Sequence, residues 1–143
     1  MISKIIPPGK SFAGLCRYLF QNKESAQVIF SEGVRDYDHA KMAADFTLQA
    51  SQNTRLKSPV LHDILSWPPG ENIGTDIMTN IVKEYLENLG LLETQFAVIK
   101  HIDKEHQHVH LVVNRVSNSG KTINDSYIGL RGKKIAQQLT LKY

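Results

Sequence analysis

The chain has 143 residues, of which 41% are hydrophobic and 22% are charged, a composition typical of a single soluble globular domain. Its one cysteine, Cys16, excludes an internal disulfide. No apolar run approaches the roughly 20 residues that span a bilayer, and the N-terminal segment is too short for a secretory signal. We therefore expect a cytoplasmic protein without a membrane partner.

The net charge is +3, from 17 basic and 14 acidic residues. This mild excess favours an anionic partner but does not by itself identify a nucleic acid. The basic residues gather near the two ends, at Lys4, Lys10, Arg17 and Lys23 and at Arg115, Lys121, Arg131, Lys133, Lys134 and Lys142. Such clustering is equally typical of a solvated surface.

The first half of the chain predicts strands alternating with helices. The expected strands are 2–6, 28–30 and 59–67, and the expected helices are 11–22 and 37–51. Pro7-Pro8-Gly9 should close the first strand, because a central strand does not tolerate proline. Ser11 is placed to cap the first helix.

The second half predicts a long helix, a hairpin and a last helix. The long helix begins at Thr75 or Asp76 and ends before Gly90, a favoured left-handed cap. Its apolar stripe is Ile77, Ile81, Tyr85 and Leu89. The hairpin strands are 95–100 and 109–116, joined by the polar segment 103–107, and 127–143 forms the last helix. The order predicts an α+β fold with an antiparallel or mixed sheet covered by helices. We expect one domain over 1–143, and its abrupt end leads us to expect a truncated piece of a longer protein.

Four of the six histidines lie within ten residues: His101, His106, His108 and His110. Side chains of a strand alternate between faces, so His108 and His110 point the same way with Cα atoms about 6.5 to 7 Å apart. The hairpin can bring His101 beside His108, which would complete three nitrogen ligands and leave open positions on a metal. The alternative is a set of unrelated polar histidines on an exposed strand.

Two further residues of this segment have open roles. Asp103 could orient an imidazole or accept a proton, or it could only shape the turn. His106 is two residues before His108, so strand alternation would place both on the same face, but His106 lies in the loop. We therefore expect it behind the metal ligands or facing a phosphate.

A metal on three imidazoles can polarise a phosphoryl oxygen, but the reaction also needs a nucleophile. The tyrosines are Tyr18, Tyr37, Tyr85, Tyr127 and Tyr143. Tyr85 belongs to an apolar stripe, whereas Tyr18 follows Arg17 near the N-terminal basic residues. Tyr18 is therefore the best placed to face a backbone phosphate.

Three segments occur in a characteristic order. Ser11-Phe12-Ala13-Gly14 leads to Arg17-Tyr18, residues 62–71 read His-Asp-Ile-Leu-Ser-Trp-Pro-Pro-Gly-Glu, and residues 101–110 read His-x-Asp-x-x-His-x-His-x-His before Leu-Val-Val-Asn-Arg-Val. Together they resemble the tyrosine, middle and histidine motifs of conjugative and mobilisation relaxases of the MOBP class, in the HUH endonuclease superfamily. The resemblance covers most of the chain.

The resemblance implies a palm-like antiparallel sheet with a metal site on its central strands and helices packed behind. It implies that Tyr18 is the nucleophile, that His101, His108 and His110 bind the metal, and that Asp103 assists. Tyr18 would attack a phosphodiester at an origin of transfer, leaving a 5′-phosphotyrosine link and a free 3′-OH, and strand transfer would later reverse this step.

The same resemblance implies Mg²⁺ or Mn²⁺ as the working ion, although imidazole ligands equally suit Zn²⁺ or Ni²⁺. The implied partners are single-stranded DNA at the origin and accessory mobilisation proteins. The length departs from the family, whose relaxase domains run further at the C-terminus, where helices help to clamp the DNA.

Further candidate DNA contacts are Arg17, Ser66, Trp67, Asn114 and Arg115. Trp67 could stack on a base or could be a buried structural residue. Strand alternation places Asn114 on the same face as His108 and His110. It could bond a metal ligand or a phosphate, or could close the sheet edge. His39 and His62 carry no predicted role.

Three other functions stay open. A rolling-circle replication initiator would share the chemistry, but the middle motif around Ser66 and Trp67 favours mobilisation. A metal-dependent hydrolase that activates water would form no covalent product, and no histidine follows His110 to build a dinuclear centre. A non-catalytic module would bind single strands in a salt-dependent manner without cutting them.

Overall fold

A computed structural model describes residues 1–22, 24–101 and 106–143 of the chain. Within these ranges one five-stranded sheet has the order β1-β3-β5-β4-β2, and all neighbouring strands are antiparallel. The strands are β1 (Ile2–Gly9), β2 (Ala26–Glu32), β3 (Val60–Ser66), β4 (Phe96–His101) and β5 (His108–Asn114). The predicted α+β fold is confirmed, with an antiparallel rather than a mixed sheet.

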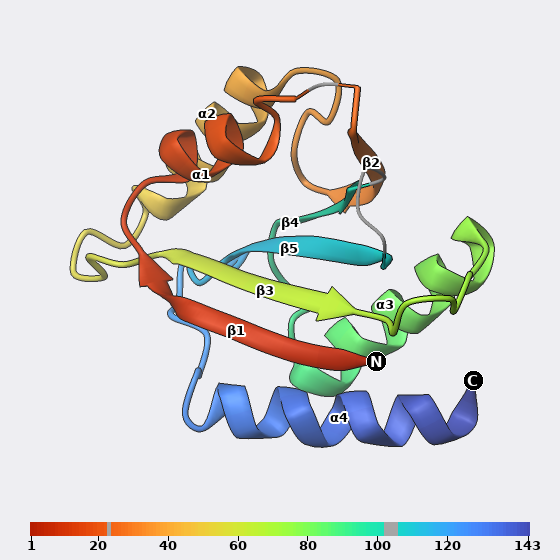
Figure 1. The fold of residues 1–143 in the computed structure, drawn as a ribbon. Coiled ribbons are helices and arrows are strands. Elements are labelled where there is room, and N and C mark those ends of the chain that lie inside the picture. Colours follow the sequence, from red (N-terminus) through yellow and green to blue (C-terminus); the bar gives the residue numbers. More distant parts are fainter. Residues whose placement is uncertain (23, 102–105) are drawn as a thin grey trace.

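Helices cover both faces of the sheet (Figure 1). The helices are α1 (Phe12–Leu19), α2 (His39–Ala50), α3 (Thr75–Leu89) and α4 (Ile128–Lys142). The first two lie together over one face, and α3 and α4 lie on the other side, as the two separate apolar clusters also show. No helix in the described part of the chain is both long and apolar enough to cross a membrane.

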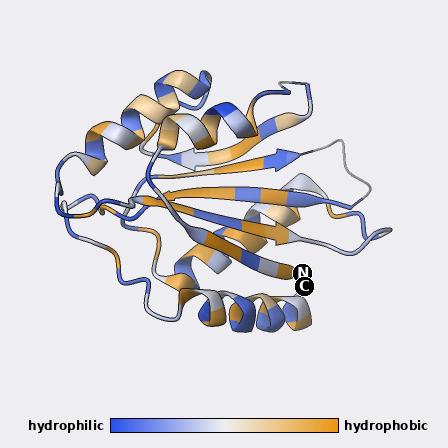
Figure 2. Cartoon of the chain, turned by 60° about the vertical axis from the view of Figure 1, so that its left-hand side comes forward, coloured by the Kyte–Doolittle hydropathy of each residue, from blue (hydrophilic) through white to orange (hydrophobic). Residues whose placement is uncertain are grey.

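The central strand β5 divides its side chains between these two cores. Val109, Leu111 and Val113 join the cluster beneath α3 and α4. On the opposite face, Val112 packs with residues of α1 and α2, while His108 and His110 precede it toward the strand's beginning. Figure 2 shows the central strands largely orange and the helices alternating orange with blue, as expected for amphipathic elements packed on a sheet.

Local sequence signals place the helix ends. The Ser11 hydroxyl accepts the Gly14 N–H at 2.9 Å, which confirms it as the cap of α1. Asp38 caps α2 by accepting the N–H groups of Ala40 and Lys41. Gly90 ends α3 with φ of 76°, the left-handed conformation that its position predicts.

Two local predictions were wrong. β1 continues through Pro7-Pro8 to Gly9, because it is an edge strand and its pairing with β3 shifts register between Ile6 and Gly9, where missing N–H donors are tolerated. In α3, Ile77 is 52% exposed and Met78 is buried instead. Seven residues make almost two full turns, so Met78 falls above Tyr85 and Ile77 turns away.

Candidate active site

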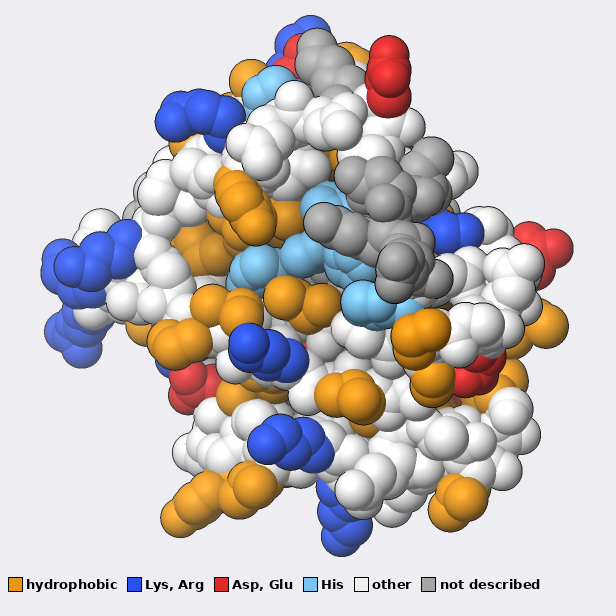
Figure 3. Space-filling view, viewed as in Figure 1, with side chains coloured by type: hydrophobic (Ala, Val, Ile, Leu, Met, Phe, Trp, Pro, Cys, Tyr) orange, Lys and Arg blue, Asp and Glu red, His pale blue; other side chains and the backbone are white. Residues whose placement is uncertain are grey.

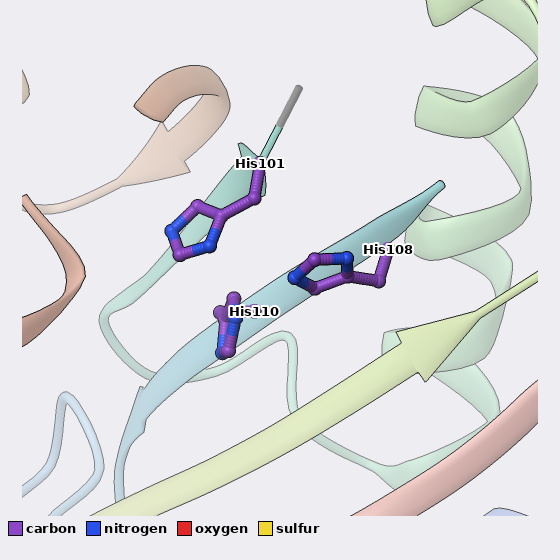
Figure 4. Close-up of side chains that lie close together, drawn as sticks. All are labelled: His101, His108 and His110. Atoms are coloured by element: carbon purple, nitrogen blue, oxygen red, sulfur yellow. The ribbon is translucent and has the colours of Figure 1, made fainter. Parts of the chain in front are cut away.

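The strand pairing gathers three histidines at one end of the sheet. His101 is the residue directly opposite His108 in the β4–β5 pairing, and His110 lies two residues further along β5 on the same face. One nitrogen from each ring lies within 4.8 Å of the others. Figure 4 shows the three rings converging from the two strands. This geometry is what the sequence spacing predicted for a metal triad.

Hydrogen bonds engage one nitrogen in each of two of these rings. Nε2 of His101 lies 3.2 Å from the carbonyl oxygen of Leu19. Because a carbonyl only accepts, His101 carries its proton on Nε2, and Nδ1 keeps the lone pair. Nδ1 of His110 lies 2.8 Å from Nε2 of His62 on β3, which leaves Nε2 of His110 for an ion.

The surroundings favour the neutral form of His110, as metal binding requires. Burial, reinforced by positive charge that would form on His101, His62 and His108, lowers the pKa of His110 to about 3. Burial also lowers the pKa of His62, with His101 adding to the effect. His108 and His110 are only 8% and 6% exposed. Three convergent imidazole nitrogens fit a divalent ion with open coordination positions.

The triad lies in an open pocket of about 940 Å³, which we call the histidine pocket. Its described lining residues are Ile2, Lys4, Tyr18, Leu19, Gln21, Asn22, Ser25, Ile64, Ser66, Trp67, Pro68, Pro69, His101, His106, His108 and His110. Figure 3 shows the histidines gathered on this side of the molecule and bordered by hydrophobic side chains. The pocket is therefore mainly apolar, with a polar floor where the ligands converge.

Tyr18 is the tyrosine that shares this pocket with the triad. All five tyrosines lie in the described part of the chain, and Tyr37, Tyr85, Tyr127 and Tyr143 do not line it. Tyr18 lies on the last turn of α1 and is 60% exposed. Its hydroxyl is thus open to a ligand that enters the pocket.

Residues of the middle motif also line the pocket. Ser66, the last residue of β3, pairs with His108 across the sheet and lines the pocket. The Trp67 N–H donates to the carbonyl of Gln107, while the Gln107 side chain bonds both the N–H and the carbonyl of Ile73. Gln107 therefore ties the Pro68–Ile73 loop to the strand that carries the histidines.

The other predicted site residues differ in their position relative to the histidine pocket. Trp67 lines the histidine pocket but is only 3% exposed and packs in the core with α3, so it has the position of a buried structural residue. Arg17 lines a different groove, between α1 and α2. His106 lies at the pocket with its ring centroid 5.9 Å from that of His108, and Asp103 falls outside the described residues.

Asn114 and Arg115 are buried and bonded to other residues of the fold. Asn114 is fully buried; its amide N–H groups donate to the carbonyl of Phe46 and to Gln95, and its oxygen accepts the Val116 N–H. Arg115 is 9% exposed, donates to the carbonyl of Ser58 and pairs with Asp125 at 3.2 Å. Asn114 shares the face of the triad, as predicted, but α2 covers that end of the strand.

Three residues at the site had no role predicted from the sequence: His62, Lys4 and Gln107. His62 is four residues before Ser66 on β3, so strand alternation places both side chains on the same face as the triad. This spacing could have identified His62. Lys4 reaches the pocket because it pairs with Ile64, which in turn pairs with His110. The Gln107 bonds depend on a loop conformation that no sequence pattern specified.

Comparison with known proteins agrees with this geometry. Residues 18–143 match the family model described as relaxase, MobA/VirD2-like, nuclease domain. A 67-residue segment is 30% identical to protein MobA of Acidithiobacillus ferrooxidans, and this match covers 47% of the chain but only 16% of that protein. The family match spans most of the chain and begins at Tyr18. The chain therefore belongs to the relaxase family and carries its MobA/VirD2-like nuclease domain.

Proposed function

We propose that this chain nicks and rejoins one strand of DNA at the origin of transfer of a plasmid or mobile element. The observation that carries the proposal is the presence of Tyr18 and the convergent histidine triad in one open pocket. Transesterification of a phosphodiester needs a nucleophilic hydroxyl and, in a metal-dependent enzyme, a site for a divalent ion beside it. Family membership supports a DNA substrate.

The proposed reaction exchanges one phosphoester bond for another. The Tyr18 oxygen attacks phosphorus while the bond from phosphorus to the 3′-oxygen breaks, and the tyrosine gives up its proton as the departing 3′-oxygen takes one up. The products are a 5′-phosphotyrosine and a free 3′-OH, and attack by a 3′-OH reverses the step. A bound divalent ion would supply neutralisation of charge on the phosphoryl oxygens.

The residues of the chain have separate tasks in this scheme. His101, His108 and His110 hold the ion, with Mg²⁺ or Mn²⁺ as the proposed working metal and Zn²⁺ or Ni²⁺ as alternatives that imidazoles accept. Asp103 remains our proposed base or orienting group. Accessory mobilisation proteins remain the proposed partners of the complete protein.

Lys4 and Ser66 are proposed to position the DNA strand. Lys4 is the basic residue among the described residues that line the histidine pocket. It can neutralise a phosphate next to the scissile one, and the Ser66 hydroxyl can donate to a phosphate oxygen beside His108. The apolar wall at Pro68 and Pro69 suits the faces of sugars and unstacked bases.

The test uses a 5′- or 3′-labelled single-stranded oligonucleotide that carries the origin, with Mn²⁺ or with chelator. The account predicts a metal-dependent cut and a protein–DNA adduct that survives denaturing electrophoresis and disappears after protease treatment. Tyr18→Phe should abolish the adduct, because it removes the attacking oxygen. The matched control is Tyr37→Phe, since Tyr37 is 71% exposed but lies outside the pocket. Cutting without an adduct would instead indicate a water nucleophile.

A further inference from the structure

We infer that His62 is a positioning residue. Its Nε2 accepts a hydrogen bond from the Nδ1–H of His110 and thereby directs Nε2 of His110 toward the metal. This inference rests on the proposed metal site. The two nitrogens lie 2.8 Å apart, and the ring centroids are 5.1 Å apart with an interplanar angle of 29°. The contact therefore combines a hydrogen bond with ring packing.

The chemistry of neutral imidazole allows two arrangements of this pair, and metal binding selects one. If His62 Nε2–H donated to His110 Nδ1, the proton of His110 would sit on Nε2, which would then have no lone pair for an ion. If His110 Nδ1–H donates to His62, Nε2 of His110 keeps its lone pair. His62 must then carry its own proton on Nδ1. His62 thus sets the tautomer of a ligand without touching the ion.

The fold holds His62 where this bond can form. Its strand β3 lies directly beside β5, where Ile64 is paired with His110 and His62 with Val112. The two rings therefore meet diagonally across one face of the sheet. His62 is half-buried, so water replaces it less readily than it would an exposed side chain. Leu19 plays the corresponding part for His101, through a backbone oxygen instead of a side chain.

The first test measures Mn²⁺ affinity by titration calorimetry in His62→Leu and His62→Gln. Loss of a group that orients a metal ligand typically weakens binding about 10- to 100-fold, and we expect a loss in this range for His62→Leu. The glutamine side chain of the second variant offers an amide oxygen that can still accept the His110 proton, so His62→Gln should recover most of the affinity. His39→Leu is the control, because His39 lies outside the histidine pocket.

Thermal unfolding of the metal-free proteins separates positioning from stability. We expect the three variants to retain a folded metal-free state, so that the loss in His62→Leu appears in metal affinity. Equal Mn²⁺ affinity of His62→Leu and the unchanged protein, within about twofold, would overturn the inference while leaving the metal site intact. Failure of the unchanged protein to bind Mn²⁺ would overturn both the inference and the proposed metal site.

A second measurement needs no variant. Long-range proton–nitrogen NMR correlations on the histidine rings of the Zn²⁺-loaded protein report which nitrogen of each ring carries the proton. The inference predicts a proton on Nδ1 of His110 and on Nδ1 of His62. A proton on Nε2 of His110 in the metal-loaded protein would contradict it, even if His62→Leu failed to fold.

Discussion

The carbonyl oxygen of Leu19 accepts a hydrogen bond of 3.2 Å from Nε2 of His101. Leu19 is the last residue of α1 and the neighbour of Tyr18, whereas His101 is the last residue of β4. One hydrogen bond therefore joins the helix that bears the proposed nucleophile to a proposed metal ligand. An ion that immobilises His101 should also steady the end of α1.

Hydrogen exchange tests this connection. We expect Mn²⁺ to slow exchange of the Phe20 amide, which is bonded to the carbonyl of Cys16 at the end of α1. In His101→Ala this protection should disappear, because the link to Leu19 is lost. The Met42 amide in α2, bonded to the carbonyl of Asp38, serves as an internal reference. Identical exchange of Phe20 with and without Mn²⁺ would show that the helix and the ion are not coupled.

The metal site itself is tested by His108→Ala. Removing one of three nitrogen ligands should weaken Mn²⁺ binding by roughly 100-fold or more, beyond the effect of losing an orienting partner, and DNA cleavage should fall with it. Calorimetry gives the affinity directly, and His39→Ala is the matched control. Unchanged Mn²⁺ affinity in His108→Ala would mean that the ligands lie elsewhere.

A third prediction concerns Lys4. Replacing it with methionine keeps a long unbranched side chain but removes one positive charge from the histidine pocket. The affinity for single-stranded DNA should therefore fall. The slope of log affinity against log salt should lose about 0.7, the value for one phosphate contact on a single strand. Lys133→Met, an exposed position on α4 across the sheet, should leave the slope unchanged. Equal slopes for the two variants would remove Lys4 from the binding surface.

Stability should depend on pH through Asp63, a buried residue on the other face of β3. Burial raises its pKa to about 6, although hydrogen bonds from the hydroxyls of Tyr85 and Ser3 partly oppose this. The pKa of Asp63 is therefore higher in the folded than in the unfolded protein. Its contribution to the free energy of unfolding is complete below about pH 4 and is lost as pH rises through about 6.

Asp63→Asn should therefore flatten the pH dependence of the free energy of unfolding between pH 4 and pH 7. The difference between the two proteins over this interval should be up to about 3 kcal/mol, from the pKa change. Urea unfolding at several pH values measures it. Parallel curves for the two proteins would show that Asp63 titrates normally in the fold.

The triad was predictable because it depends on two short-range rules. Strand alternation put His108 and His110 on one face, and the hairpin put His101 opposite His108. The same rules predicted the correct face for Asn114 but not its burial, because strand alternation does not say which part of a face a helix covers. The packing of α2 against that end of β5 is a long-range result that turns Asn114 into a buried bridge.

His62 shows a second limit of the sequence. Its role arises from the neighbouring strand order β3-β5, and this order joins segments that are separated by α3 and β4 along the chain. A single sequence without a known topology does not say that β3 lies beside β5. The edge position of β1, which lets Pro7-Pro8 continue the strand, was hidden for the same reason.

In the proposed reaction Tyr18 becomes covalently joined to DNA with the help of the histidine triad. The most direct measurement is mass spectrometry of proteolytic peptides after reaction of the unchanged protein with origin single-stranded DNA and Mn²⁺. We expect one nucleotide-bearing peptide, with the 5′-phosphate on Tyr18, which is absent when chelator replaces Mn²⁺. A cleaved strand with no modified peptide, or a modification on another tyrosine, would contradict it.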